Sequence, residues 1–179
     1  MGFADRRGKV ARLLADGDLV ALRRGLYASR RDLDPLGLAA AIYGPSYVSF
    51  ETALAWHGRI PEAVREMMSA TIKRPACFEN SLGRFRYLRV PLAAYPVGVT
   101  RNGEGELPFL IASPTKALCD LIARQPGFRS MAEVGRWLDG MRFDPGHGLA
   151  GQELRDCAAA YRRPAVRWLS PWAEKKGWI

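Results

Sequence analysis

Basic side chains that could bind phosphate gather at the start of this 179-residue chain. Residues 1–31 hold eight Lys and Arg against three Asp, a surplus of five positive charges. A guanidinium group pairs bidentately with phosphate or with the edge of guanine, so this segment is a candidate DNA contact. The alternative is a solvated face on a small N-terminal hairpin, and the residues alone leave both interpretations open. The candidate DNA-binding residues are Arg6, Arg7, Lys9, Arg12, Arg23 and Arg24.

A second basic set lies further along the chain, in segments that alternate between apolar and polar residues. It consists of Lys73, Arg74, Arg84, Arg86 and Arg89. One interpretation is a further surface for nucleic acid, such as tRNA. The other is the polar outer face of a sheet whose inner face packs on helices, and this one is favoured.

Residue types that usually perform catalysis are sparse and badly spaced. His57 and His147 are the only histidines, and neither has a carboxylate or a cysteine at metal-ligand spacing. Three cysteines about forty residues apart do not predict a disulfide framework, and Cys119 and Cys157 fall in apolar helical patterns that predict buried thiols. No nucleophile elbow, phosphate-binding P-loop or Rossmann glycine pattern is present. We therefore predict a protein that is not an enzyme and has no metal and no cofactor.

Lys116 and Asp120 are the one oppositely charged pair that we single out on a predicted helix. Their spacing of four residues places both side chains on the same face. A surface ion pair, or the polar edge of a core helix, explains them, and we assign them no functional role.

The distribution of charge over the chain indicates a polyanionic partner. The net charge is +9, but residues 32–123 hold nine charges of each sign, so the surplus lies at the two ends. A neutral middle between basic ends favours a polyanionic partner, most simply nucleic acid. The alternative is a basic surplus that only keeps the protein in solution, and composition alone leaves it open. No apolar run approaches the roughly 18 residues of a membrane span, and the first residues do not resemble a secretory signal. We expect a cytoplasmic protein without a membrane partner.

The elements that must position the N-terminal arginines are a helix and a hairpin. Residues 3–18 carry an apolar stripe at helical spacing, and Asp16-Gly17 should end the helix. Two short strands, "LVAL" and "LYA", then flank Arg23-Arg24-Gly25, which we expect to form a three-residue loop with a left-handed glycine. The polar stretch from Ser29 to Asp34 is the most plausible domain boundary.

The rest of the chain is predicted to form a small sheet followed by helices. Asp34 and Ser49 should cap two short helices, and four alternating or apolar segments between residues 69 and 113 predict about four strands. Ser113 and Ser130 should cap two further helices, and a last helix should begin at Pro164 and break at Pro171. The sequence therefore predicts an α+β fold with a C-terminal helical region.

Several stretches, in order, resemble a known family. They are "LVALRRGLYA", "DPLGLAAAIYGPSYVSFETALAWHGRIPEAV", "TIKRP", "ENSLGRFRYLRVP" and "FLIASPTKALCDLI". Together they resemble the AbiEi family, the antitoxins of bacterial abortive-infection toxin–antitoxin systems of type IV, which are also predicted transcriptional regulators of phage defence. The likeness runs from about Leu19 to Ile122, and "PSYVSFETAL" is its most specific part.

The resemblance implies a two-part protein. An N-terminal winged helix would bind double-stranded operator DNA and repress its own operon, with Arg6, Arg7, Lys9 and Arg12 on its helix and Arg23 and Arg24 on its wing. The α/β region would neutralise a nucleotidyltransferase-like toxin, usually without a stable complex. The alternative is an antitoxin that acts through its C-terminal region on the toxin or on the toxin's RNA substrate, without specific DNA binding.

Two departures from the family pattern change what we expect. Family members usually have two further helices before the helix that precedes the wing, so we predict a reduced, partial winged helix in residues 1–33 and an antitoxin domain with C-terminal helices in residues 34–179. In addition, Thr115 stands where the family more often has Glu before Lys116, so no role of that acidic residue is carried over.

Overall fold

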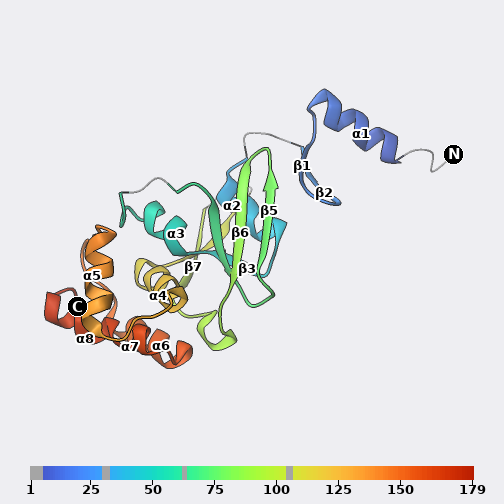
Figure 1. The fold of residues 1–179 in the computed structure, drawn as a ribbon. Coiled ribbons are helices and arrows are strands. Elements are labelled where there is room, and N and C mark those ends of the chain that lie inside the picture. Colours follow the sequence, from blue (N-terminus) through green and yellow to red (C-terminus); the bar gives the residue numbers. More distant parts are fainter. Residues whose placement is uncertain (1–5, 30–32, 62–63, 104–106) are drawn as a thin grey trace.

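Helices and strands mix in this chain as the sequence predicts, and the α+β class is confirmed (Figure 1). The computed structural model describes residues 6–29, 33–61, 64–103 and 107–179. The helices are α1 Arg6–Asp16, α2 Pro35–Ile42, α3 Phe50–Trp56, α4 Pro114–Arg124, α5 Met131–Gly140, α6 Gly151–Tyr161, α7 Pro164–Arg167 and α8 Leu169–Lys176, with a 3₁₀ turn, η1, at Leu92–Ala94. None of these helices has the length and the apolar character that a membrane crossing requires.

The N-terminal unit consists of α1 and a two-stranded hairpin. Helix α1 has no buried residue and ends before Gly17, whose φ of +80° confirms the predicted left-handed glycine. Strands β1, Val20–Arg23, and β2, Leu26–Ala28, pair in antiparallel fashion. Arg23 faces Leu26, so the loop has two residues instead of the expected three, and an irregularity in register between Ala21 and Arg23 absorbs the difference.

A six-stranded mixed sheet forms the centre of the molecule, in the order β5-β6-β4-β3-β8-β7. Its strands are β3 Ser46–Val48, β4 Met67–Thr71, β5 Ala76–Asn80, β6 Gly83–Arg89, β7 Val99–Asn102 and β8 Phe109–Ala112. The pairs β4–β6 and β3–β8 are parallel, and the other neighbours are antiparallel. We expected about four strands. The two additional strands are β3, whose three residues are all buried and show no alternation, and β5, which pairs with β6 in the folded sheet.

Helices cover both faces of this sheet. On one face, the Tyr87 hydroxyl donates to the carbonyl of Ala39 in α2 at 2.6 Å. On the other, the Tyr47 hydroxyl reaches α4, which packs against α3 and α6. Helices α5 to α8 lie beyond α4, at the side away from the N-terminal unit (Figure 1). The core is therefore shared between the sheet and the C-terminal helices.

Most of the predicted helix caps are confirmed. The Asp34 carboxylate accepts from Leu36 N at 2.9 Å, and the hydroxyls of Ser113 and Ser130 accept from the backbone N–H three residues on. The break in the last helix was placed wrongly, because it falls at Trp168 between α7 and α8. Pro171 lies in the first turn of α8, where proline is tolerated because its missing N–H would have no partner.

The hairpin is attached to the edge of the central sheet. Val20, Leu22 and Ala28 are buried, and the side-chain amide of Asn80, at the end of β5, donates to the carbonyl of Leu22 at 3.0 Å. The boundary predicted near residue 33 stays a prediction, since residues 30–32 lie outside the described residues, as do Phe3 to Asp5 of the predicted first helix.

Candidate functional site

All six N-terminal candidate residues are exposed to solvent on the helix and hairpin. Arg6, Arg7, Lys9 and Arg12 lie on α1, and Arg23 and Arg24 lie at the tip of the hairpin. In Figure 1, α1 and the hairpin stand to one side of the central sheet. Five of the six candidate residues, Arg7, Lys9, Arg12, Arg23 and Arg24, form no ion pair with any described residue. Their charges are therefore available to an external anion.

The tip of the hairpin is built around Gly25. Its φ of +76° lies in the left-handed region, which a residue with a Cβ enters only at a cost. This turn places Arg24 in the loop and Arg23 at the end of β1, and both are exposed whereas Val20 and Leu22 are buried. The predicted role of the glycine is confirmed, although the loop is shorter than expected.

The second basic set does not form one continuous surface. Arg84 pairs with Glu79 at 3.1 Å, and Arg86 pairs with Glu66 at 2.8 Å. The Lys73 ammonium donates to the carbonyl of Gly44, and the exposed Arg74 accepts a hydrogen bond at its backbone carbonyl from Tyr43. Arg89 lies apart, at the far end of β6 beside a pocket. This arrangement favours the interpretation of a polar sheet face over that of a second nucleic-acid surface.

A buried ionic network lies between β3, α3, α4 and α6. Lys116 and Asp120 have no exposed surface, and the Lys116 Nζ lies 2.6 Å from Asp120 Oδ1. Tyr161 donates to the same carboxylate oxygen at 2.5 Å. Tyr47 and Ser49 donate to Asp120 Oδ2 at 2.8 and 2.7 Å. One carboxylate thus accepts hydrogen bonds from three hydroxyls and forms an ion pair with one ammonium. Of the two interpretations of this pair, a surface ion pair is therefore wrong, and the two side chains belong to a core helix.

The Lys116 ammonium is also held by aromatic rings. Its Nζ lies 4.9 Å from the centre of the Tyr161 ring and 5.7 Å from that of Tyr47. A cation over the face of an aromatic ring is attracted by the negative charge density of that face, and more strongly when water is excluded. The two tyrosines therefore stabilise both charges of the pair, the carboxylate through their hydroxyls and the ammonium through their rings.

Ser49 has a different role from the one predicted. It stands at the N-terminus of α3, but its hydroxyl makes no capping bond and donates to Asp120 instead. The next residue, Phe50, is fully buried with a φ of +56°, an uncommon conformation for an aromatic residue. Such strain persists only where the surroundings enforce it. At this site it directly follows Ser49, whose hydroxyl donates to Asp120 of α4.

Burial raises the pKa of several groups around Asp120. Burial, followed by the negative charge of Asp120, raises the pKa of both Tyr47 and Tyr161 well above the usual value of 10.0. Both phenols therefore remain protonated donors. A hydrogen bond with Cys157, followed by burial, raises the pKa of the Cys119 thiol. Both thiols are buried, as the sequence predicted, and are poor nucleophiles for that reason.

The two histidines occupy different surroundings. His57 ends α3, and its Nε2 lies 2.9 Å from the carbonyl oxygen of Ala112. His147 is exposed in the loop before α6. Within the part of the chain that the structure describes, no group of three or more His, Cys, Asp or Glu side chains is placed to hold a metal ion.

Comparison with known proteins adds no family to this picture. The chain matches no protein-family model, and no curated protein matches it. The likeness to AbiEi antitoxins therefore stays at the level of the sequence stretches quoted above.

Proposed function

We propose that this protein binds double-stranded DNA through α1 and the β1–β2 hairpin and represses its own operon. The observation that carries this proposal is the set of six exposed basic residues on one helix–hairpin unit, of which five are without an ion pair among the described residues. Phosphate binding needs cations that are not already neutralised within the protein. The order of helix followed by hairpin is also the order in which a winged helix presents its recognition helix and its wing.

The dimensions of α1 suit this role. Its 11 residues span about 16 Å at 1.5 Å per residue, and a major groove about 12 Å wide admits an α-helix. Helix residues would then approach base edges, while Arg23 and Arg24 would contact the backbone or a narrow minor groove. Because α1 buries no residue, this helix can contact DNA without the core being rearranged.

We further propose that residues 34–179 act as the antitoxin of an abortive-infection system, opposing a nucleotidyltransferase-like toxin without a stable complex and without catalysis. The support for this part is the resemblance in sequence, together with a core that residues 34–179 fill almost entirely. The alternative, an antitoxin without specific DNA binding, differs only in what the N-terminal unit does. One experiment therefore separates the two.

The test measures binding of the full chain to DNA from upstream of its own gene, by fluorescence anisotropy across a salt series. The logarithm of affinity should fall with the logarithm of salt concentration by about 0.9 for each phosphate contacted. Arg23→Ala/Arg24→Ala should weaken binding and reduce that slope by up to about 1.8. Arg101→Ala/Arg136→Ala removes the same charge from exposed positions outside the N-terminal unit and should leave the slope unchanged.

Two results would count against the proposal. If the Arg23/Arg24 variant bound with unchanged affinity and slope, the hairpin would not be a wing. If both double variants lost the same amount of DNA affinity, binding would depend on net charge alone. Co-expression of the Arg23/Arg24 variant with the toxin then tests the second part, because antitoxicity located in residues 34–179 should survive the loss of DNA binding.

A further inference from the structure

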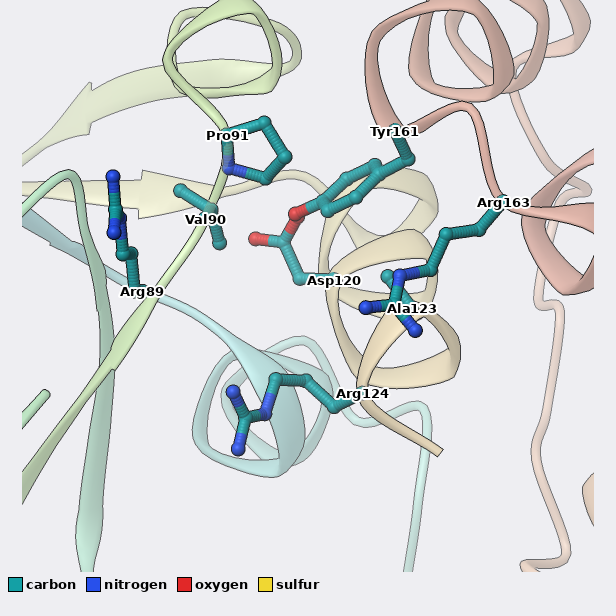
Figure 2. Close-up of a pocket in the computed structure, with 8 residues that line it drawn as sticks. All are labelled: Arg89, Val90, Pro91, Asp120, Ala123, Arg124, Tyr161 and Arg163. Atoms are coloured by element: carbon teal, nitrogen blue, oxygen red, sulfur yellow. The ribbon is translucent and has the colours of Figure 1, made fainter. Parts of the chain in front are cut away.

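An arginine-lined pocket of about 470 Å³ lies beside the buried ionic network (Figure 2). Arg89 enters it from the end of β6, Arg124 from the end of α4, and Arg163 from the link between α6 and α7. Figure 2 shows these three side chains around one opening, with Val90 and Pro91 on another side. Three elements that are distant in the sequence thus bring three guanidinium groups to one place.

The three guanidinium groups have no carboxylate partner among the described residues. Asp120 lies at the base of the pocket, but it has no exposed surface, and Lys116 balances its charge. Three hydroxyls occupy its oxygen atoms as well. The pocket therefore presents three positive charges at its rim and no accessible negative charge.

A second pocket on the same molecule provides the contrast. It contains Arg84 and Arg86, and each of these pairs with a carboxylate, Glu79 and Glu66 respectively. Arg84 and Arg86 are thus neutralised by carboxylates within the protein, whereas the three arginines around the first pocket are not. Like charges that face one opening repel each other, and an anion bound between them relieves that repulsion.

We propose that this pocket binds a phosphate-bearing ligand of about mononucleotide size. A guanidinium group can donate two parallel hydrogen bonds to phosphate oxygens. The pocket volume of about 470 Å³ falls within the range of small-molecule binding sites. Val90 and Pro91 supply an apolar wall beside the charges, as a sugar or base next to a phosphate requires. Tyr161 completes the pocket, and it is fixed by its bond to Asp120.

The pocket is separate from the proposed DNA-binding unit. The hairpin is attached through Asn80, which pairs with Gly83 at the start of β6, whereas Arg89 ends the same strand. Seven residues of strand separate the two by roughly 20 Å, at about 3.3 Å per residue. The pocket therefore goes beyond the proposed function, and either proposal can fail without the other.

The test is a titration of the full chain with AMP, followed by calorimetry and by thermal unfolding, with adenosine and inorganic phosphate as comparison ligands. AMP should bind with a Kd below about 1 mM and raise the unfolding temperature, and adenosine should do neither. Arg124→Ala and Arg163→Ala should each weaken AMP binding by about tenfold or more, since each removes a charged hydrogen-bonding fork. Arg167→Ala, an exposed residue of α7 outside the pocket, is the matched control and should bind AMP normally.

A comparison of 5′-phosphorylated and 5′-hydroxyl oligonucleotides distinguishes the two sources of such a phosphate. Tighter binding of the phosphorylated strand than of the 5′-hydroxyl strand would assign the pocket to the end of a nucleic-acid strand. AMP binding with no difference between the two strands would assign it to a free nucleotide. The proposal is overturned if AMP and phosphate do not bind at millimolar concentration. It is also overturned if the pocket variants bind AMP as well as the Arg167 variant does. Melting curves without ligand show whether each variant is folded.

Discussion

Replacing Asp120 by Asn tests the buried network most directly. The side chain keeps its shape, so no cavity forms, but the Lys116 ammonium loses its counter-charge while it remains fully buried. Removing one partner of a buried ion pair costs about 3–5 kcal/mol, because the remaining charge is uncompensated. A surface pair would contribute only about 0–1 kcal/mol. Since small domains are stable by about 5–15 kcal/mol, Asp120→Asn should lower stability by a large fraction of the total.

The remaining members of the network predict which variants should be more stable than others. Lys116→Met removes the cation, but the carboxylate still accepts from Tyr47, Ser49 and Tyr161. Hydrogen bonds to a carboxylate stabilise its ionised form, so Lys116→Met should lower the free energy of unfolding by less than Asp120→Asn does. The double variant has neither charge, and buried ion pairs can be replaced by neutral groups at little cost. It should therefore be more stable than Asp120→Asn alone.

Urea unfolding followed by circular dichroism measures the three free energies and the wild-type value. The coupling energy from this cycle should be about 0.5–3 kcal/mol, the range for residues in one network. The slope of free energy against urea concentration must stay constant, since a change would mean an altered unfolded state or loss of two-state behaviour. A loss of only about 1 kcal/mol for Asp120→Asn, or additive effects in the double variant, would refute a buried and coupled pair.

Three further predictions concern protonation and backbone conformation. Because burial and Asp120 raise the pKa of Tyr47 and Tyr161, these phenols should remain protonated in the folded state above about pH 10, where unfolded tyrosine ionises. Their stabilising contribution is complete below that pH and is lost as the pH rises further, so tyrosinate absorbance should develop in two stages, the second together with unfolding. Burial likewise raises the pKa of Glu51 above 4.5, so the folded state binds its proton more tightly and stability should fall as the pH rises from 4.5 towards neutrality. Glu51→Gln should flatten that dependence in urea titrations at acidic and neutral pH, whereas an unchanged slope would contradict the assignment. Gly25→Ala should lower the free energy of unfolding by about 1–2 kcal/mol, because the φ of Gly25 is +76°. The added Cβ would contact nothing within 4 Å, so the cost comes from the backbone conformation alone. Gly140→Ala, the same change at the end of α5, also meets nothing within 4 Å but should stabilise by about 0.4–1 kcal/mol in the same melting experiment.

Local features of the fold could be predicted from the sequence, because they depend on neighbouring residues. The caps formed by Asp34, Ser113 and Ser130 each involve a partner two or three residues away. The left-handed Gly25 and the class of the fold follow from the same kind of short-range pattern. The short strands β3 and β5 were missed, because their place in the sheet depends on neighbours that only the folded chain supplies.

The buried network could not be predicted, because its partners come from three distant parts of the chain. The spacing of Lys116 and Asp120 shows that they share one face of a helix, but not which way that face turns. Tyr47 lies 73 residues before Asp120, and Tyr161 lies 41 residues after it. Of the arginine pocket, only Arg89 belonged to a predicted set, whereas Arg124 and Arg163 had no pattern that joined them. Ser49 was predicted as a helix cap, and only the structure shows that its hydroxyl donates to Asp120 instead.

Whether a basic side chain is paired with a carboxylate says more about its role than the net charge of the chain does. The chain carries nine surplus positive charges, yet its buried lysine and its sheet-face arginines Arg84 and Arg86 are all paired with carboxylates. Among the described residues, Arg23 and Arg24 at the hairpin form no ion pair, nor do Arg89, Arg124 and Arg163 around the pocket at the opposite end of β6. Unpaired cations that face one another repel and so reduce the stability of the free protein. A binding partner that supplies phosphate removes this repulsion, and the same repulsion therefore favours binding at both places. Arg124→Ala should therefore slightly stabilise the free protein and weaken its binding of the phosphate ligand. Arg24→Ala should likewise slightly stabilise the free protein and weaken its binding of DNA.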